Sequence, residues 1–179
     1  FGLEVYPAGP GDAERSADLI QEFDIDVFVG NPSFAMELGS HGADAIDYVI
    51  GGGEPFTSIP GQRENVYDAF GGLEAAVDVF GLRQAIPVSM ECAAEEGLHV
   101  VDDTMLVEII DPDTGEVADP GDRGEVVLTH IRKDAMPLVR YRTGDLSILE
   151  GGACSHCDAT VTMPQGVFGR TDERLKVKG

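Results

Sequence analysis

The N-terminal half of the chain alternates between segments with helical spacing and short apolar runs, and this alternation constrains the fold more than any other feature. Residues 12–23 space their apolar side chains along one face of a helix, and residues 26–30 (DVFVG) form an apolar run typical of a buried parallel strand. A strand pattern in 44–55, a helical pattern in 61–72 and another strand pattern in 75–81 follow. Because parallel neighbours must be joined by crossover segments, the pattern predicts an α/β fold, a parallel sheet with crossover helices.

Beyond about residue 90 the pattern changes to strands and turns. Strand character is present in 97–101, 105–111 and 124–131, and the intervening DPDTGE carries the Pro, Asp and Gly that favour turns. The second part is therefore predicted to be a β-rich, barrel-like subdomain. The expected division is as follows: 1–90 for the α/β subdomain, 91–168 for the β-rich subdomain with metal-binding loops, and 169–179 for a terminal segment.

The three cysteines of the chain point to a metal site. Cys154 and Cys157 lie three residues apart in ACSHCDAT, and Cys92 is followed seven residues later by His99. A structural zinc takes four thiolate or imidazole ligands, and such an ion can clamp loops that lack a core of their own. The sequence therefore predicts a zinc site with Cys92, His99, Cys154 and Cys157 as ligands.

Two alternatives to this ligand set remain open at the level of sequence. His156 lies between the paired cysteines and can replace His99, although a ligand so close to both thiols strains a tetrahedral site. The other alternative has no metal: Cys92 is a small buried residue, His99 an ordinary strand residue, and the remaining pair free thiols or a strained disulfide.

The formal net charge of −21, from 33 acidic and 12 basic residues, argues against binding to nucleic acid or to an anionic membrane. The acidic residues are dispersed along the whole chain, which is typical of proteins that stay hydrated at high salt. No signal peptide and no apolar run of about 20 residues is visible, and three cysteines at metal-like positions favour a reducing, cytoplasmic setting. The chain begins with Phe1, as expected for a fragment or for the ordered part of a longer protein.

Two predicted strands end in glycine-rich segments, at residues 51–55 and 79–84. Ligands of open parallel sheets bind at the carboxyl ends of the strands, where glycines let the backbone approach them closely. An aromatic side chain at such a place, here Phe80, can stack on a purine. Glycine after a strand more often marks an ordinary turn, so these segments alone do not establish a ligand site.

The segment RYRTGDLSIL places a carboxylate, Asp145, after an expected tight turn. A fixed carboxylate can accept two hydrogen bonds from a ribose diol, whereas Arg140 and Arg142 can meet phosphate or pair with acidic residues. The last segment, 168–179, gathers basic residues in an otherwise acidic chain, and a solvated terminal strand is its simplest interpretation.

In this order, these stretches resemble the adenylate-forming acyl-CoA ligases, and specifically their phenylacetate-CoA ligase branch. The matching stretches cover most of residues 45–179 and a preceding helix entry: GNPSFAMEL, GGGEPFT, VFGL, GLHVVDDTMLVEIIDPDTGEV, GEVVLTHIRKDAMPLVRYRTGDL and FGRTDERLKVKG. The resemblance implies an enzyme that joins a carboxylic acid, most simply an aromatic one, to AMP with Mg-ATP. It then transfers the acyl group to coenzyme A. Small carboxylic acids and nucleotides are accordingly the expected partners.

The resemblance also implies roles for individual residues. The expected nucleotide and hinge residues are Gly53, Glu54 and Pro55 beside the adenine, Phe80 stacked on it, Asp145 on the ribose hydroxyls, Arg170 near the nucleotide, and Asp172 at the hinge to a small C-terminal domain. Residues 1–90 would then be a partial nucleotide-binding subdomain. A structural zinc is in keeping with the resemblance, because members of this branch can carry one.

The chain departs from the family pattern in three ways. The glycine-rich phosphate loop is expected upstream of residue 1, and the C-terminal domain with its assisting lysine beyond residue 179. The third departure is internal: Arg83 and Gln84 stand where the family has a hydroxyl residue and a glutamate. A neutral amide holds magnesium weakly, and Arg83 can instead bind a phosphate directly.

These departures lead to two expectations. The chain alone is expected to show little or no adenylation, and the alternative to an acid-CoA ligase is a degenerate, non-catalytic nucleotide-binding or scaffold protein stabilised by zinc. The exposed edge of a sheet that lacks its preceding strands is also expected to be covered by a second copy of the chain or by a complementary chain.

Overall fold

The computed structural model describes residues 2–8 and 11–172. The elements follow one another in this order: α1 (Ala13–Phe23), β1 (Val27–Gly30), α2 (Pro32–Ser40), β2 (Tyr48–Gly52), α3 (Gln62–Phe70), β3 (Ala75–Leu82), β4 (Ala85–Met90), β5 (Leu98–Val100), β6 (Met105–Ile110), β7 (Arg123–His130), β8 (Tyr141–Ile148), β9 (Glu150–Gly151), β10 (Val161–Met163) and β11 (Gly169–Arg170). None of the helices in this part of the chain is long and apolar enough to span a bilayer.

A seven-stranded sheet with the order β1-β2-β3-β4-β5-β10-β9 runs through the molecule. Strands β1, β2 and β3 are parallel, with Gly30 opposite Gly51 and Gly52 opposite Val79, and all further pairings are antiparallel. The alternation in the sequence therefore predicted the parallel part correctly. The fold class, an α/β unit followed by a β-rich part, is confirmed.

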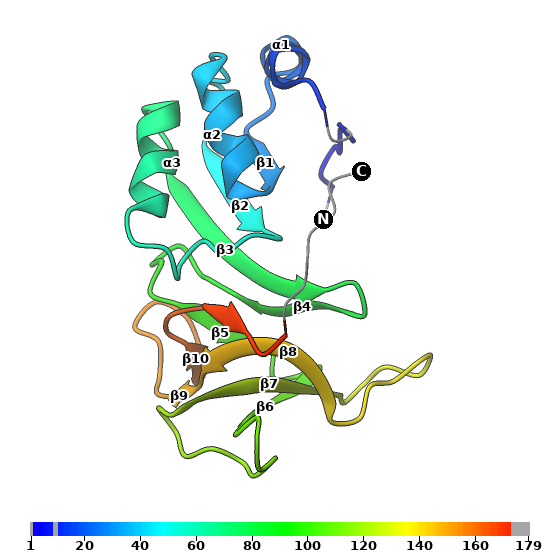
Figure 1. The fold of residues 1–179 in the computed structure, drawn as a ribbon. Helices are drawn as coiled ribbons and strands as arrows, with labels where there is room; N and C mark the ends of the chain where they lie inside the picture. The colour runs from blue at the N-terminus through cyan, green and yellow to red at the C-terminus, as the bar shows by residue number, and fades with distance from the viewer. Residues whose placement is uncertain (1, 9–10, 173–179) are drawn as a thin grey trace.

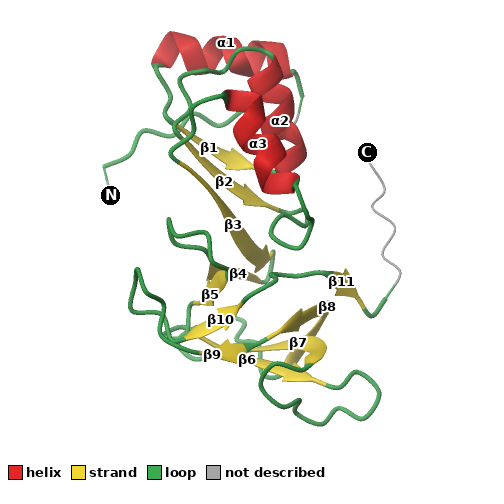
Figure 2. Cartoon of the chain, turned by 90° about the vertical axis from the view of Figure 1, so that its left-hand side faces the viewer, coloured by secondary structure: helices red, strands yellow, loops and turns green. Residues whose placement is uncertain are grey.

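The three helices lie together on one face of the parallel strands (Figures 1 and 2). The side chain of Asp12 caps α1, and that of Asn31 caps α2 ahead of Pro32 in its first turn, which leaves no orphan amide at that position. Helix α3 ends at Phe70 and is capped by Gly71, whose φ of 72° is the left-handed conformation that glycine adopts readily. The apolar faces of these helices and of the parallel strands form one buried cluster: Ala13, Ala17, Ile20, Ala35, Leu38, Ala43, Ile46, Val49, Phe56, Val66, Phe70 and Ala76.

A second, four-stranded antiparallel sheet has the order β11-β8-β7-β6. It packs against the antiparallel end of the first sheet, because Val126 and Leu128 of β7 share a buried cluster with Val88 of β4, Leu98 of β5 and Met163 of β10. The two buried clusters draw their members from residues 13–76 and 85–163. The predicted domain division near residue 90 stays a prediction that this distribution supports.

One strand was not predicted, and one local prediction needs correction. Residues 85–90 form β4, an antiparallel hairpin partner of β3 that the sequence pattern did not indicate. Asp145 does not follow a tight turn: it lies inside β8, at an irregularity where the β7 partners shift from Glu125 to Val127. The bulged backbone, with Gly144 at a φ of 77°, takes the place of the expected turn. The basic terminal segment beyond Asp172 lies outside the described residues.

Candidate functional site

The predicted metal ligands come together from two loops and one strand. Cys92 lies in the loop after β4, His99 in β5, and Cys154 and Cys157 in the loop between β9 and β10. Strand β10 pairs with β5, with Thr162 opposite His99, so the sheet itself brings residues of distant sequence position side by side. One candidate ligand atom from each of the four residues lies within 4.8 Å of every other.

The separations between these atoms fit a tetrahedral ion. Zn–S bonds of about 2.3 Å and Zn–N bonds of about 2.0 Å place two sulfurs about 3.8 Å apart and a sulfur and a nitrogen about 3.5 Å apart. The Sγ atoms of Cys92 and Cys154 are 3.9 Å apart, and Cys157 Sγ lies 3.3 Å from His99 Nδ1. The donor set of three thiols and one imidazole is the chemistry that zinc prefers.

His156 is not part of this cluster. Its ring Nδ1 lies 2.8 Å from the hydroxyl of Ser155, and the residue is exposed. Its backbone N–H donates to Cys154 Sγ, and this hydrogen bond lowers the pKa of the Cys154 thiol. A lowered thiol pKa favours the thiolate, which is the form that binds a metal. The geometry thus favours His99 as the fourth ligand and gives His156 a supporting role.

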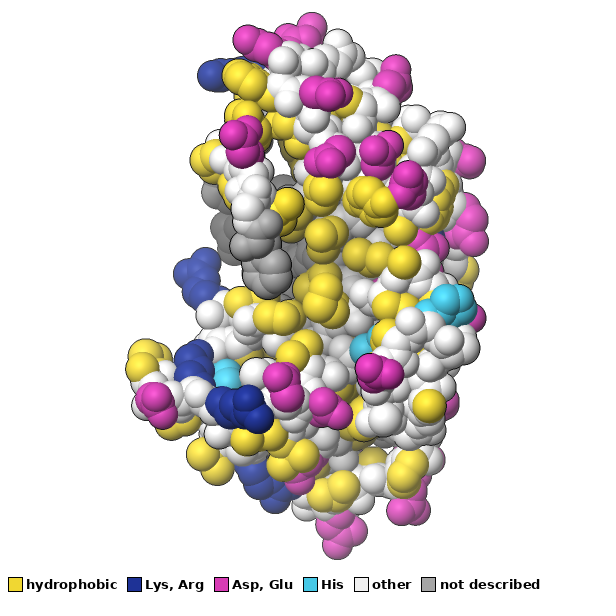
Figure 3. Space-filling model, turned by 180° about the vertical axis from the view of Figure 1, so that it is seen from behind, with side chains coloured by type: hydrophobic (Ala, Val, Ile, Leu, Met, Phe, Trp, Pro, Cys, Tyr) yellow, Lys and Arg dark blue, Asp and Glu magenta, His cyan; other side chains and the backbone are white. Residues whose placement is uncertain are grey.

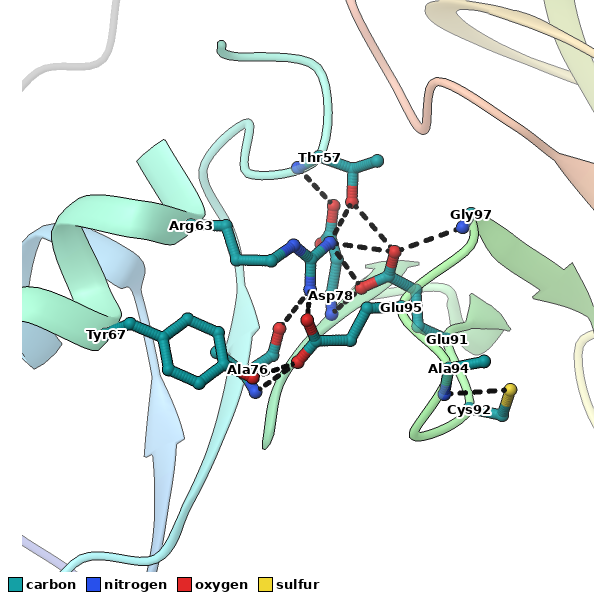
Figure 4. Close-up of polar contacts among 10 residues, drawn as sticks. All are labelled: Thr57, Arg63, Tyr67, Ala76, Asp78, Glu91, Cys92, Ala94, Glu95 and Gly97. Carbon is teal, nitrogen blue, oxygen red and sulfur yellow. Dashed lines mark hydrogen bonds and ion pairs between the residues drawn. The ribbon is translucent and has the colours of Figure 1, made fainter. Parts of the chain in front are cut away.

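A buried polar network lies next to Cys92 and joins helix α3 to the loop between β4 and β5 (Figure 4). The guanidinium of Arg63 donates to both carboxylate oxygens of Glu91, at 2.9 and 2.8 Å. The side chain of Glu91 is 0% exposed, and it also accepts hydrogen bonds from the backbone N–H groups of Asp78 and Gly97. A buried carboxylate with this many donors fixes the loop that presents the metal ligands.

Glu95 supplies a second carboxylate to the same network. It accepts hydrogen bonds from the hydroxyl of Tyr67 at 2.5 Å and from the backbone N–H of Ala76 at 2.7 Å, and it lies 3.6 Å from Arg63. Burial and the hydrogen bond to Glu95 raise the pKa of Tyr67 to about 12, so the phenol stays a proton donor. Arg63 therefore holds two acidic side chains of one loop against the parallel half of the sheet.

Asp78 gives this network a pH dependence that can be measured. Burial raises the pKa of Asp78 above its ordinary value of 3.8, although the N–H of Thr57 partly offsets this effect. The folded state therefore binds the proton more tightly than the unfolded state, and the wild type loses stability as the pH rises through the raised pKa. Asp78→Asn is expected to be more stable than the wild type at neutral pH and equally stable below about pH 3.8.

Urea unfolding of both proteins between pH 3 and pH 7 tests this expectation. Asp68→Asn, at an exposed position of α3, is the matched control and should leave the stability unchanged. A stability difference that stays constant over the whole pH range would contradict an origin in the ionisation of Asp78.

The glycine-rich ends of β2 and β3 lie side by side. Gly52, the last residue of β2, pairs with Val79 of β3, so Gly53 after the end of β2 and Phe80 in β3 come next along the two neighbouring segments. The carboxylate of Glu54 is held by Ser33, whose hydroxyl lies 2.5 Å from it, and thereby joins the end of β2 to the start of α2. Gly53, Glu54, Pro55 and Phe80 thus share the edge at which parallel sheets bind ligands.

Asp145 lies in β8 directly opposite Arg170 in β11, and these two side chains form an ion pair. The guanidinium of Arg170 also donates to Asp172 at 2.6 Å and to the carbonyl of Thr143 at 3.1 Å. A Cβ at position 144 would lie only 2.5 Å from Arg170, and the φ of 77° there is one that side chains rarely adopt, so glycine suits this position. The structure therefore brings together the three charged residues that the resemblance assigned to the nucleotide and the hinge.

Residues 166–167 connect the glycine-rich strand ends to the strand that carries Asp145. The hydroxyl of Ser58, in the loop after β2, donates to the carbonyl of Val167 at 2.7 Å, and the hydroxyl of Ser147 in β8 donates to that of Gly166 at 2.7 Å. The strand ends and the Asp145–Arg170 pair are thus tied to the same short stretch of chain.

Arg140 and Arg142 do not join this site. Arg140 pairs with Glu108 at 3.2 Å, and Arg142 donates to the buried carboxylate of Glu125 at 2.9 Å. Of the two interpretations left open by the sequence, pairing with acidic residues is the one that the structure shows.

Arg83 and Gln84 form the turn between β3 and β4, and both side chains are exposed. Lys133, in the loop between β7 and β8, donates from Nζ to the carbonyl of Gln84 at 2.8 Å. A cation from the second sheet therefore reaches the end of β3.

No protein-family model matches the sequence. A phenylacetate-coenzyme A ligase of Thermus thermophilus is 36% identical over 190 aligned positions, which include 100% of this chain and 42% of the relative. A phenylacetate-coenzyme A ligase of Aromatoleum evansii is 33% identical over 100% of this chain and 41% of its own length. The chain is a relative of the phenylacetate-coenzyme A ligases. It spans about two-fifths of the length of these relatives, 42% in the first case.

Solved structures agree with this relationship at the level of the fold. An open conformation of 2-hydroxyisobutyryl-CoA ligase, in complex with 2-HIB-AMP and CoA, superimposes with a TM-score of 0.82 over 95% of this chain and 39% of that protein, at 23% identity. The luciferase-like enzyme of the mealworm Zophobas morio gives a TM-score of 0.60 over 92% of this chain at 15% identity. The fold predicted from the resemblance to phenylacetate-coenzyme A ligases is thus confirmed.

Sequence reasoning missed two parts of the site. The pair Arg63–Glu91 joins residues 28 positions apart, and nothing in the sequence near either residue indicates the other. The contact of Lys133 with the turn of Arg83 joins a loop between two strands of one sheet to a turn of the other sheet. The only signal in the sequence was that Lys133 is a basic residue in an acidic chain, and this does not indicate which segment Lys133 contacts.

Proposed function

We propose that this chain is part of an acid-CoA ligase of the phenylacetate-CoA ligase type. The observation that carries the proposal is the similarity over 100% of the chain to a relative named phenylacetate-coenzyme A ligase. In the proposed reaction a carboxylate oxygen of the acid attacks the α-phosphorus of ATP, and pyrophosphate leaves with the electron pair of the broken P–O bond. The thiol sulfur of coenzyme A then attacks the acyl carbonyl and loses its proton, and AMP leaves.

The residues of this chain have binding and positioning roles in the proposal. Gly53, Glu54 and Pro55 line the adenine, and Phe80 stacks on it. Asp145 accepts hydrogen bonds from the two ribose hydroxyls, because its carboxylate is held in place by the bulge of β8 and by Arg170. Arg170 then lies beside the nucleotide, and Asp172 lies where a following domain would turn.

The proposed metal is a structural zinc. Four protein ligands leave no open position for a substrate, which is the arrangement of structural rather than catalytic zinc sites. Cys92, His99, Cys154 and Cys157 would hold the ion and thereby join the loop after β4 to the loop before β10. This ion would supply stability to the β-rich half and take no part in the chemistry.

Two further proposals concern the setting of the chain. The charge of −21 supports a protein adapted to high salt, and the unpaired cysteines support a reducing, cytoplasmic environment. Val29 of the outermost parallel strand is 70% exposed, which supports cover by a second copy or a complementary chain.

Nucleotide binding tests the proposal directly. ATP and AMP are expected to bind in concentrated KCl, and Asp145→Ala is expected to weaken binding at least about 100-fold, because two hydrogen bonds to a charged group contribute roughly 1.5–3 kcal/mol each. Isothermal titration calorimetry measures both affinities. Asp119→Ala, at an exposed turn position, removes the same charge and should bind as the wild type does. Equal affinity of the Asp145→Ala variant would contradict the assigned site.

The second candidate function is nucleotide binding without catalysis. It is favoured by Arg83 and Gln84, which stand where the family has a hydroxyl residue and a magnesium-binding glutamate. A polypeptide of these 179 residues is expected to release little pyrophosphate from ATP and an aromatic acid in either case, since the phosphate loop and the assisting lysine are assigned to other segments. Formation of acyl-AMP by this polypeptide alone would overturn that expectation.

A further inference from the structure

The turn between β3 and β4 carries one basic residue, Arg83, and is contacted by a second, Lys133. Arg83 projects from an exposed two-residue turn, and Lys133 is fixed next to it by the hydrogen bond of 2.8 Å to the carbonyl of Gln84. The turn belongs to the seven-stranded sheet, whereas Lys133 comes from the loop between two strands of the other sheet. The fold therefore places Lys133 against the turn that carries Arg83, although the two residues lie 50 positions apart in the sequence.

These cations differ in their partners from four of the other arginines, although Arg15, Arg123 and Arg132 also form no ion pair among the described residues. Arg63, Arg140, Arg142 and Arg170 each form an ion pair with a carboxylate. Within residues 2–8 and 11–172, neither Arg83 nor Lys133 forms one, although 33 acidic residues are present in the sequence. Two cations without carboxylate partners can bind an external anion without first breaking an ion pair.

The surface shows where basic side chains lie. Seen from behind, the Lys and Arg side chains of the lower half lie mainly toward one side of the molecule, with some Asp and Glu side chains among them and others over the rest of the visible face (Figure 3). The turn between β3 and β4 reaches the corresponding side in Figure 1. A local positive potential on an acidic protein concentrates anions at that place.

The position of the turn fits the phosphate end of a nucleotide. Phe80, proposed to stack on the adenine, lies in β3, and Arg83 follows three residues later, about 10 Å further along the strand direction. Gln84 replaces a carboxylate by a neutral amide, and two nearby cations repel Mg²⁺. The site is therefore poor for a divalent cation and well suited to the anion that such a cation would accompany.

We infer that Arg83 and Lys133 form a binding site for the phosphate groups of the nucleotide that works without a divalent cation. The inference rests on the proposed nucleotide-binding function and assigns to two side chains the charge neutralisation that magnesium supplies elsewhere. Arg83 donates through its planar guanidinium to two phosphate oxygens, and Lys133 adds a point charge.

Calorimetry at one fixed KCl concentration tests the inference with four probes: ATP, AMP, adenosine and inorganic pyrophosphate. We expect the affinity for ATP to be the same within about twofold in Mg²⁺ and in EDTA, and to exceed the affinity for adenosine at least about tenfold. In the Arg83→Ala/Lys133→Ala variant, ATP and pyrophosphate should lose about tenfold or more, whereas adenosine should bind unchanged. Arg15→Ala, at an exposed position of α1, is the control for a general loss of charge.

A second variant tests the inference by a gain of Mg²⁺ dependence instead of a loss of affinity. Arg83→Ser with Gln84→Glu restores the residue types of the family, and it should make ATP binding dependent on Mg²⁺. The inference is overturned if wild-type ATP binding requires Mg²⁺, or if the double alanine variant binds ATP and pyrophosphate as the wild type does. Absence of adenosine and AMP binding would instead overturn the proposed function, so the two failures are distinguishable. Circular dichroism melting confirms that each variant is folded.

Discussion

Replacing Cys154 with serine is expected to lower the midpoint of thermal unfolding by more than about 10 °C. Structural zinc contributes roughly 10–16 kcal/mol of apparent binding free energy in zinc-finger peptides, and a third of that suffices for such a shift in a domain of this size. The reason is structural: β10, which follows the loop of Cys154 and Cys157, is joined to β5 and β9 by short strand pairings, and the ion would add a direct link from that loop to the loop of Cys92. Calorimetric melting in concentrated KCl, with and without a chelator, measures the effect.

The matched control for this variant is His156→Ala. His156 lies in the same loop but outside the ligand cluster, so its removal should change the melting midpoint by only a few degrees. Elemental analysis should find one zinc per chain in the wild type and in His156→Ala, and far less in Cys154→Ser. Full stability of the wild type after thorough chelation would contradict a structural metal.

Arg63→Met is expected to destabilise the fold by about 3–5 kcal/mol, because it leaves a buried carboxylate without its partner. Glu91 is 0% exposed in its side chain, and Arg63 is its only ion-pair partner among the residues that the structure describes. The substitution also removes the contact of the guanidinium with the ring of Phe56, 5.0 Å from its centroid. Urea unfolding at constant pH and salt gives the free energy of unfolding.

The pair Arg140–Glu108 provides the comparison. The side chain of Arg140 is 55% exposed, and an exposed ion pair contributes at most about 1 kcal/mol, so Arg140→Met should have a small effect. The double variant Arg63→Met/Glu91→Gln should recover part of the loss, because the neutral amide removes the unpaired charge. Equal effects of Arg63→Met and Arg140→Met would show that the buried pair does not fasten α3 to the loop that bears Cys92.

Local signals explain what the sequence predicted well. The parallel strands carry apolar runs that end in glycine, and the stretch GNPSFAMEL indicated a helix entry that the structure reproduces in α2. The ligand cluster could be proposed because the chain has only 3 cysteines, so a set of thiols left few combinations. The choice of His99 over His156 needed only the geometric limit on a four-ligand site.

The missed features depend on contacts between distant segments. Strand β4 has no regular alternation, with a buried pair at Val88 and Ser89, and it is held by its neighbours β3 and β5 rather than by its own pattern. Likewise, a buried Glu91 looks in sequence like any of the 33 acidic residues. Burial and pairing of charge are set by tertiary packing, which a local sequence pattern does not contain.

The distance in sequence between the two halves of the metal cluster has a consequence for the order of events during folding. The thiols of Cys92 and Cys154 are 62 positions apart, so the loop between them must close before an ion can gain its third and fourth ligands. Cys154 and Cys157 alone supply only two of the four proposed ligands. We therefore expect the ion to bind after the sheet has formed. Bound zinc should then lower the unfolding rate and leave the folding rate unchanged.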